Sequence, residues 1–156
     1  MRIPKASLRI LAGCAETLAP HGPIGSWQGG EPDAAGVIQI PWHEYSPEID
    51  RFTSDMYAAK LVRPVDWMAW ARTPGAQHLF SDPTAIAHAS HDDLVYLLTT
   101  IIRGERFSDG EIAGAYERGT LLAIAERAQA LLGGEPGQVG RASQSSRGRR
   151  DDGGAN

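Results

Sequence analysis

The densest group of charged side chains surrounds the turn between two predicted helices, and it comprises Arg103, Glu105, Arg106, Asp109 and Glu111. On helical spacing Arg103 and Arg106 share a face, so their guanidinium groups could bind a carboxylate or a phosphate through paired hydrogen bonds. The same arginines could instead pair with Asp109, Glu111 or Glu117, or bond to the exposed carbonyls at the helix end. The spacing leaves both interpretations open, and we favour the second, structural one.

A second group of residues that could bind a ligand or a partner is aromatic. Trp67 and Trp70 lie three positions apart and share a helix face, next to the carboxylate of Asp66. Aromatic residues this concentrated usually pack a core. With an acid nearby they are also typical of a ligand groove or of the centre of a protein interface. The candidate ligand-binding or partner-binding residues are therefore Trp42, Tyr45, Asp66, Trp67, Trp70, Arg103, Arg106 and Asp109.

Other motifs give weaker indications. His88 and His91 are spaced for one helix face, but a predicted helix start at Ser90 separates them, so we expect no metal site. Cys14 has no histidine near it in the sequence and is expected to be a buried structural thiol. The glycines of residues 22–36 do not match the motif of a phosphate-binding loop. We predict no catalytic residue, no metal and no cofactor.

Composition and charge exclude several classes of protein. The chain has 156 residues, 42% of them hydrophobic and 22% charged, which fits one globular domain. A single cysteine excludes an intramolecular disulfide framework, and no apolar run approaches the roughly 20 residues of a membrane span. Of the fifteen basic and nineteen acidic residues, the tail from Gly133 holds four and three, so the body keeps eleven basic against sixteen acidic. An acidic body disfavours nucleic-acid binding, and we expect a cytoplasmic protein.

Hydrophobic periodicity predicts a mainly α fold, a single-domain helical bundle of about five to seven helices over residues 1–133. We expect a long loop over 19–36, at most a short extended segment near 37–40, and a disordered tail rich in glycine and arginine over 134–156. The helices 91–104 and 120–132 carry the strongest apolar stripes and should form the central pair. The other predicted helical segments are 4–18, 47–60, 67–72, 74–80, 83–89 and the stretch between Ser108 and Gly119.

Helix starts are indicated by capping residues. Such residues bond backbone N–H groups that the first helical turn leaves without partners. Ser90 with Asp93 and Ser108 with Glu111 both fit the pattern of a capping box. The single capping residues are Ser46, Asp66 and Asp82.

Several blocks of the sequence resemble the conserved pattern of one known family. Residues 41–49 (PWHEYSPEI), Phe52, Tyr57 and residues 66–70 (DWMAW) are similar to the pattern PWxxYSPEVxxF…Y…FDWxxW. The stretch from residue 93 to the helix after Gly119 is similar to the run DLxxLLTxxxRxxRFxEGxL…GxxxxIL. Both patterns are those of the DUF6508 family of bacterial proteins, which the chain resembles over about residues 37–132.

Two positions depart from the family pattern. Val65 stands where the family tends to have phenylalanine, and Asp109 where it tends to have glutamate. The resemblance implies a small helical bacterial protein and no known activity. It makes Asp66, Arg103, Arg106 and Asp109 the first positions to test.

Two functions follow as hypotheses. We favour a small non-enzymatic interaction or regulatory protein that binds a protein partner rather than nucleic acid or a membrane; its oligomeric state is left open. The alternative is a small-ligand-binding or hydrolytic protein whose polar site combines Asp66, Arg103, Arg106 and Asp109. Convergence of this site and the aromatic group on one concave pocket would favour the alternative.

Overall fold

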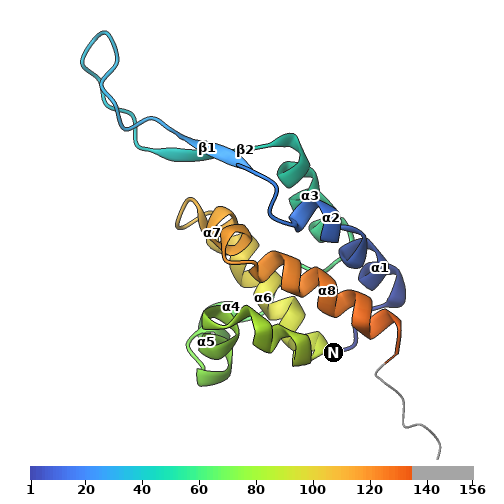
Figure 1. The fold of residues 1–156 in the computed structure, drawn as a ribbon. Helices are drawn as coiled ribbons and strands as arrows, with labels where there is room; N and C mark the ends of the chain where they lie inside the picture. The colour runs from blue at the N-terminus through green and yellow to red at the C-terminus, as the bar shows by residue number, and fades with distance from the viewer. Residues whose placement is uncertain (135–156) are drawn as a thin grey trace, which may run out of the picture.

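The computed structural model describes residues 1–134, and their fold is mainly helical, as predicted (Figure 1). The predicted disordered tail lies, from residue 135 on, outside the described residues. The elements in chain order are α1 (Lys5–Gly13), α2 (Ala15–Leu18), β1 (Gly25–Gln28), β2 (Trp42–Tyr45), α3 (Pro47–Ala58), α4 (Trp67–Ala71), α5 (Pro74–Ser81), the 3₁₀ helix η1 (Pro83–His88), α6 (His91–Gly104), α7 (Glu111–Glu117) and α8 (Thr120–Leu132).

The described part of the chain has nine helices where about five to seven were expected. One reason is that the helix predicted over 4–18 is interrupted at Cys14, which ends α1 and precedes α2. The other is that all three short segments predicted between residues 67 and 89 are confirmed as separate helices, each begun by its own capping residue. None of the helices in residues 1–134 is long and apolar enough to cross a membrane.

The core lies where the apolar stripes predict it. Leu94, Leu97 and Leu98 of α6 and Leu121 and Ile124 of α8 are fully buried. The expected pairing of these two helices is only partly met, because the backbone of α8 packs closest against α1 and η1, and that of α6 against α4 and α7. Small side chains explain the difference, since Ala125 and Ala128 on the buried face of α8 allow a neighbouring helix to approach closely.

Three of the five predicted capping signals are confirmed. Asp66 accepts the N–H of Ala69 at 3.0 Å and starts α4. Ser90 and Asp93 form the complete capping box of α6, and Asp82 starts η1. Ser46 occupies the N-cap position of α3, but its side chain makes no capping bond there.

The predicted capping box at the start of α7 is wrong. The N-cap residue is Gly110, whose φ of 95° is left-handed, so Ser108 lies two residues before the N-cap and Glu111 is the first helical residue instead of the third. The carboxylate of Glu105, from the end of α6, takes their place. It accepts the N–H of Gly110 at 2.7 Å and the N–H of Ile112 at 2.8 Å. A side chain of the preceding helix therefore caps α7.

A two-stranded antiparallel hairpin joins α2 to α3 and projects away from the helices (Figure 1). Its register pairs Gly25 with Tyr45 and Gln28 with Trp42. The expected extended segment near 37–40 lies between these strands and adds only an isolated bridge between Pro32 and Ile38. The strand follows Pro41 because proline has no N–H to donate to a ladder. The predicted loop over 19–36 consequently contains β1.

Candidate functional site

The most exposed apolar surface of the described residues lies on the hairpin, and we call residues 25–45 the arm. Every residue from 29 to 42 is exposed to solvent. Val37, Ile38 and Ile40 are 57%, 64% and 87% exposed, and Trp27 and Trp42 are 58% and 42% exposed. Large apolar side chains gathered on one projecting element, rather than scattered singly, are typical of a binding surface.

The outer part of the arm is ordered by its own hydrogen bonds. The Gly30 N–H donates to the Gln39 carbonyl at 2.9 Å, and the Asp33 N–H donates to the Val37 carbonyl at 2.9 Å. The Asp33 carboxylate also accepts the N–H groups of Ala35 and Val37, at 2.8 and 2.9 Å, which closes the tip as an Asx turn. The exposed apolar side chains thus stand on a preformed backbone.

The arm carries negative charge alone. Glu31, Asp33 and Glu44 lie on it, and the sequence has no lysine or arginine between Arg9 and Arg51. A surface that combines apolar side chains with carboxylates attracts basic surfaces and repels acidic ones.

The base of the arm is fixed to the turn between α6 and α7. The ring of Trp27 lies over Gly110 so closely that a Cβ added to that glycine would be 2.9 Å from the Trp27 Cζ2 atom. His43 lies between the rings of Trp27 and Tyr45, with ring centroids 5.3 and 4.4 Å away. The arm is therefore held in a defined orientation on the helical body.

Tyr45 completes this anchor. Its hydroxyl oxygen accepts the N–H of Ala113 at 3.2 Å. Burial, followed by a hydrogen bond with the Glu105 side chain, raises the pKa of the Tyr45 phenol well above its ordinary value. The phenol stays protonated and can donate to Glu105, the same carboxylate that caps α7. One carboxylate thus links β2 to the first turn of α7.

The predicted aromatic group divides into two separate sets. Trp42 and Tyr45 belong to the arm, with the Trp42 ring over Gly29. Trp67 and Trp70 belong to α4, where Trp70 stacks on Tyr96 with ring centroids 5.2 Å apart. These two tryptophans pack α4 against neighbouring elements, since Trp67 also lies 6.2 Å from the Phe107 ring. The expected single aromatic group does not form.

The predicted polar residues lie around the ends of α4 and α6. Asp66 uses its carboxylate to cap α4. Arg103 is half-buried at the end of α6, and Arg106 and Asp109 are exposed in the turn that follows. Within residues 1–134 these arginines make no ion pair with Asp109, Glu111 or any other carboxylate. A ligand-binding role for this group stays a prediction.

Two other titratable side chains, those of Cys14 and His91, are shaped by their structural surroundings. Burial, and then the charge of Asp55, raises the pKa of the half-buried Cys14 thiol, which lowers its fraction of reactive thiolate. The Nδ1 atom of His91 accepts the N–H of Ile3 at 3.2 Å, which ties the N-terminal segment to the start of α6. In the part of the chain that the structure describes, no three histidine, cysteine, aspartate or glutamate side chains converge as metal ligands would.

Sequence reasoning missed the residues that dominate the arm, namely Trp27, Val37, Ile38, Ile40 and the anchoring Glu105. A signal for the three aliphatic residues was present: the largely apolar run VIQIPW over 37–42 lies inside a stretch of forty-one residues without lysine or arginine. Glu105 belonged to the charged group described above, but its role depends on where the chain turns after α6.

Comparison with known proteins identifies a family. A family model described as "Family of unknown function (DUF6508)" matches residues 3–134. The match confirms the resemblance and extends it to α1, α2 and β1, outside the blocks that first indicated it. Neither a curated protein nor a solved structure matches the chain.

Proposed function

The chain belongs to the DUF6508 family, whose function is unknown, and from this premise we propose that it is a non-enzymatic interaction protein. Its arm binds a protein partner by placing Val37, Ile38 and Ile40 in an apolar groove that is bordered by basic side chains. The observation that carries the proposal is the exposure of these side chains on an ordered, anchored hairpin.

Energetics support a binding role for the arm. Fully burying a large aliphatic side chain contributes about 1.5–3 kcal/mol, so three such residues supply enough energy to anchor a partner. Binding is opposed by the loss of conformational freedom at the interface. The hydrogen bonds at the tip and the Trp27 contact at the base reduce this loss, because the arm is already ordered before it binds.

Charge supports a basic partner rather than a second copy of the arm. Glu31, Asp33 and Glu44 would face their own counterparts if two arms paired, and like charges in contact oppose association. The same carboxylates repel a phosphate backbone, so the arm is unsuited to nucleic acid. Basic side chains around an apolar groove would complement both features of the arm.

Photo-crosslinking in cells of the host tests the proposal. A photoreactive amino acid replaces Ile38, and in a matched control it replaces Ile10, a 42% exposed apolar residue on α1. We expect a discrete adduct from position 38 that position 10 does not give. The adduct should disappear when Ile40→Asp is added or when unlabelled protein competes, and the captured protein should have a basic surface.

Two results would refute the proposal. Adducts that are equal from both positions would show that the arm is not the binding surface. A concentration-dependent dimer that Ile38→Asp abolishes, seen by light scattering of the purified protein, would show that the arm binds a second copy of this chain instead.

A further inference from the structure

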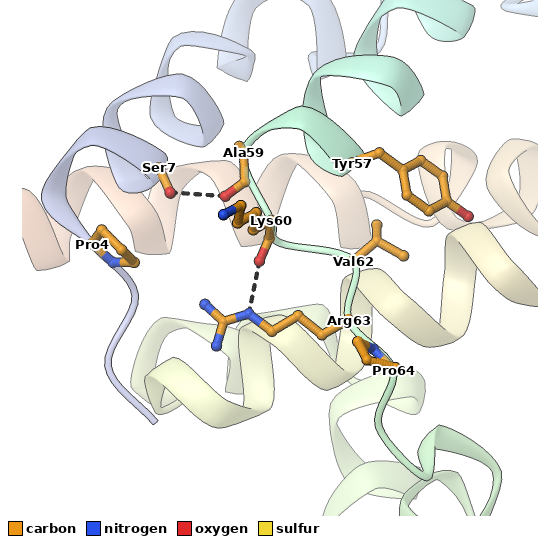
Figure 2. Close-up of a pocket in the computed structure, with 8 residues that line it drawn as sticks. All are labelled: Pro4, Ser7, Tyr57, Ala59, Lys60, Val62, Arg63 and Pro64. Carbon is orange, nitrogen blue, oxygen red and sulfur yellow. Dashed lines mark hydrogen bonds between the residues drawn. The ribbon is translucent and has the colours of Figure 1, made fainter.

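We propose that a second site, independent of the arm, binds a small aliphatic carboxylate. The site is a cavity of about 380 Å³ between the start of α1 and the linker that joins α3 to α4 (Figure 2). A volume of roughly 300–1,000 Å³ is typical of small-molecule sites. The residues that line it are Pro4, Ser7, Tyr57, Ala59, Lys60, Val62, Arg63 and Pro64.

The wall of the cavity is apolar and fixed in place. Pro4, Val62 and Pro64 present only hydrocarbon side chains to it. The buried Ser7 hydroxyl donates to the Ala59 carbonyl at 2.8 Å, which joins α1 to the end of α3 and satisfies the hydroxyl of Ser7 (Figure 2). Such a surface favours the hydrocarbon part of a ligand.

Within the part of the chain that the structure describes, the cavity is lined by two cations, Lys60 and Arg63, and by no acid. Arg63 is held by two bonds, since its backbone N–H donates to the Thr99 hydroxyl at 3.1 Å and its Nε–H donates to the Lys60 carbonyl at 2.7 Å. Its side chain extends along the linker toward the N-terminal segment (Figure 2), where Nη1 contacts the Met1 sulfur atom. The guanidinium is thus oriented, and neither the Lys60 carbonyl nor the Met1 sulfur atom that it contacts carries a negative charge. A carboxylate can accept hydrogen bonds from such a group.

The backbone at Lys60 is unusual for a lysine. Its φ of 57° is left-handed, and among the non-glycine residues described it alone has a positive φ. Lys60 follows the end of α3 in a Schellman motif, in which the Leu61 N–H donates to the Met56 carbonyl and the Lys60 N–H to the Tyr57 carbonyl, both at 3.0 Å. Glycine is the usual residue at this position because it adopts the conformation without strain. A lysine there lowers stability while it supplies a second positive charge to the cavity.

These features select a ligand with one anionic group and a hydrocarbon body. The guanidinium and ammonium groups attract the carboxylate, and the apolar wall accepts the chain. A polyphosphate is a poorer fit, because most of its oxygens would face hydrocarbon and lose their hydration. Octanoate is a simple probe of this class.

Lys60→Gly provides a clean test because it removes the charge and relieves the backbone strain together. We expect titration of the full chain with octanoate, followed by NMR of the backbone amides, to give saturable shifts in residues 59–63. Lys60→Gly and Arg63→Gln should each weaken binding by at least about tenfold, as loss of a charge-assisted contact predicts. Arg9→Gln, which removes an exposed cation elsewhere on α1, should leave the affinity unchanged.

Further measurements separate the proposal from simpler explanations. The thermal midpoint of Lys60→Gly should equal or exceed that of the wild type, so that weaker binding cannot be attributed to unfolding. Octanol and inorganic phosphate should each bind at least about tenfold more weakly than octanoate, since each lacks one half of the recognised chemistry. Absence of saturable shifts at millimolar octanoate, equal binding of octanol, or unchanged affinity in Lys60→Gly would each overturn the proposal.

Discussion

Replacing Glu105 tests how the arm and α7 are held together. Its carboxylate accepts two N–H groups at the start of α7, at 2.7 and 2.8 Å. Hydrogen bonds to a charged group contribute about 1.5–3 kcal/mol each, and the half-exposure of Glu105 favours the lower end of this range. Glu105→Ala removes both bonds and should lower the free energy of unfolding by about 3 kcal/mol. Glu105→Gln keeps one acceptor oxygen without the charge and should lower it by about 1–2 kcal/mol.

Urea denaturation followed by circular dichroism measures these changes. Glu111→Gln is the matched control, since Glu111 is an exposed acid on the first turn of the same helix and should change stability by less than about 0.5 kcal/mol. A Tyr45→Phe variant combined with Glu105→Gln should show a coupling energy of at least about 0.5 kcal/mol, because the two side chains interact. A loss below about 0.5 kcal/mol for Glu105→Ala would refute the capping role and the anchor built on it.

Three further predictions concern single positions. Gly110→Ala should destabilise the protein by about 1–2 kcal/mol, because the new Cβ strains the left-handed backbone. It should also shift the fluorescence of Trp27 to the red, because the new Cβ displaces the Trp27 ring, and unchanged fluorescence would contradict this contact. Lys60→Gly should raise the free energy of unfolding by about 0.5–1 kcal/mol in urea denaturation, and a loss of stability would show that its left-handed conformation is not strained. Burial, and then the charge of the neighbouring Arg2, lowers the pKa of His91, so the unfolded chain binds more protons than the folded one below about pH 6.5. The free energy of unfolding should therefore fall as the pH drops through this region, and it should fall less steeply in His91→Gln. Identical pH profiles of the two proteins would exclude a contribution of this histidine.

Much of the helical fold was predictable because its signals are local. The apolar stripe of α6 and the Ser90–Asp93 capping box lie within one stretch of sequence, and both are confirmed. The start of α7 was not predictable in this way. Its cap comes from Glu105, whose position depends on how the chain turns after α6, and a nearer serine fitted the capping pattern equally well.

The hairpin shows the same limit more strongly. Its strands have four residues each and no clear alternation of apolar and polar side chains, so periodicity could not identify them. Their position depends on the contact of Trp27 with Gly110, more than eighty residues away in the sequence. Tyr45 and Trp70 were predicted as members of one binding group, but each packs against a different neighbour, Ala113 and Tyr96 respectively, because the path of the chain between them keeps them apart.

The sequence spacing predicted the arrangement of the candidate polar site only in part. Helical spacing put Arg103 and Arg106 on one helix face, but α6 ends at Gly104, and Arg106 lies in the turn that follows. Spacing also could not show that Glu105, an acid of the same charged group, accepts backbone N–H groups, or that Asp66 caps α4. Both carboxylates have a structural partner, whereas ligand binding by the two arginines, the less favoured of the two interpretations drawn from the sequence, stays a prediction.

The dissociation constant of the protein captured at position 38 tests the central claim most directly. The comparison is between the wild type and Ile38→Asp, a change at an exposed position that should alter the denaturation midpoint little. Loss of one buried isoleucine predicts an affinity at least about tenfold lower for the variant. Equal affinity of the two proteins, with both correctly folded, would contradict the assignment of the arm as the partner-binding element.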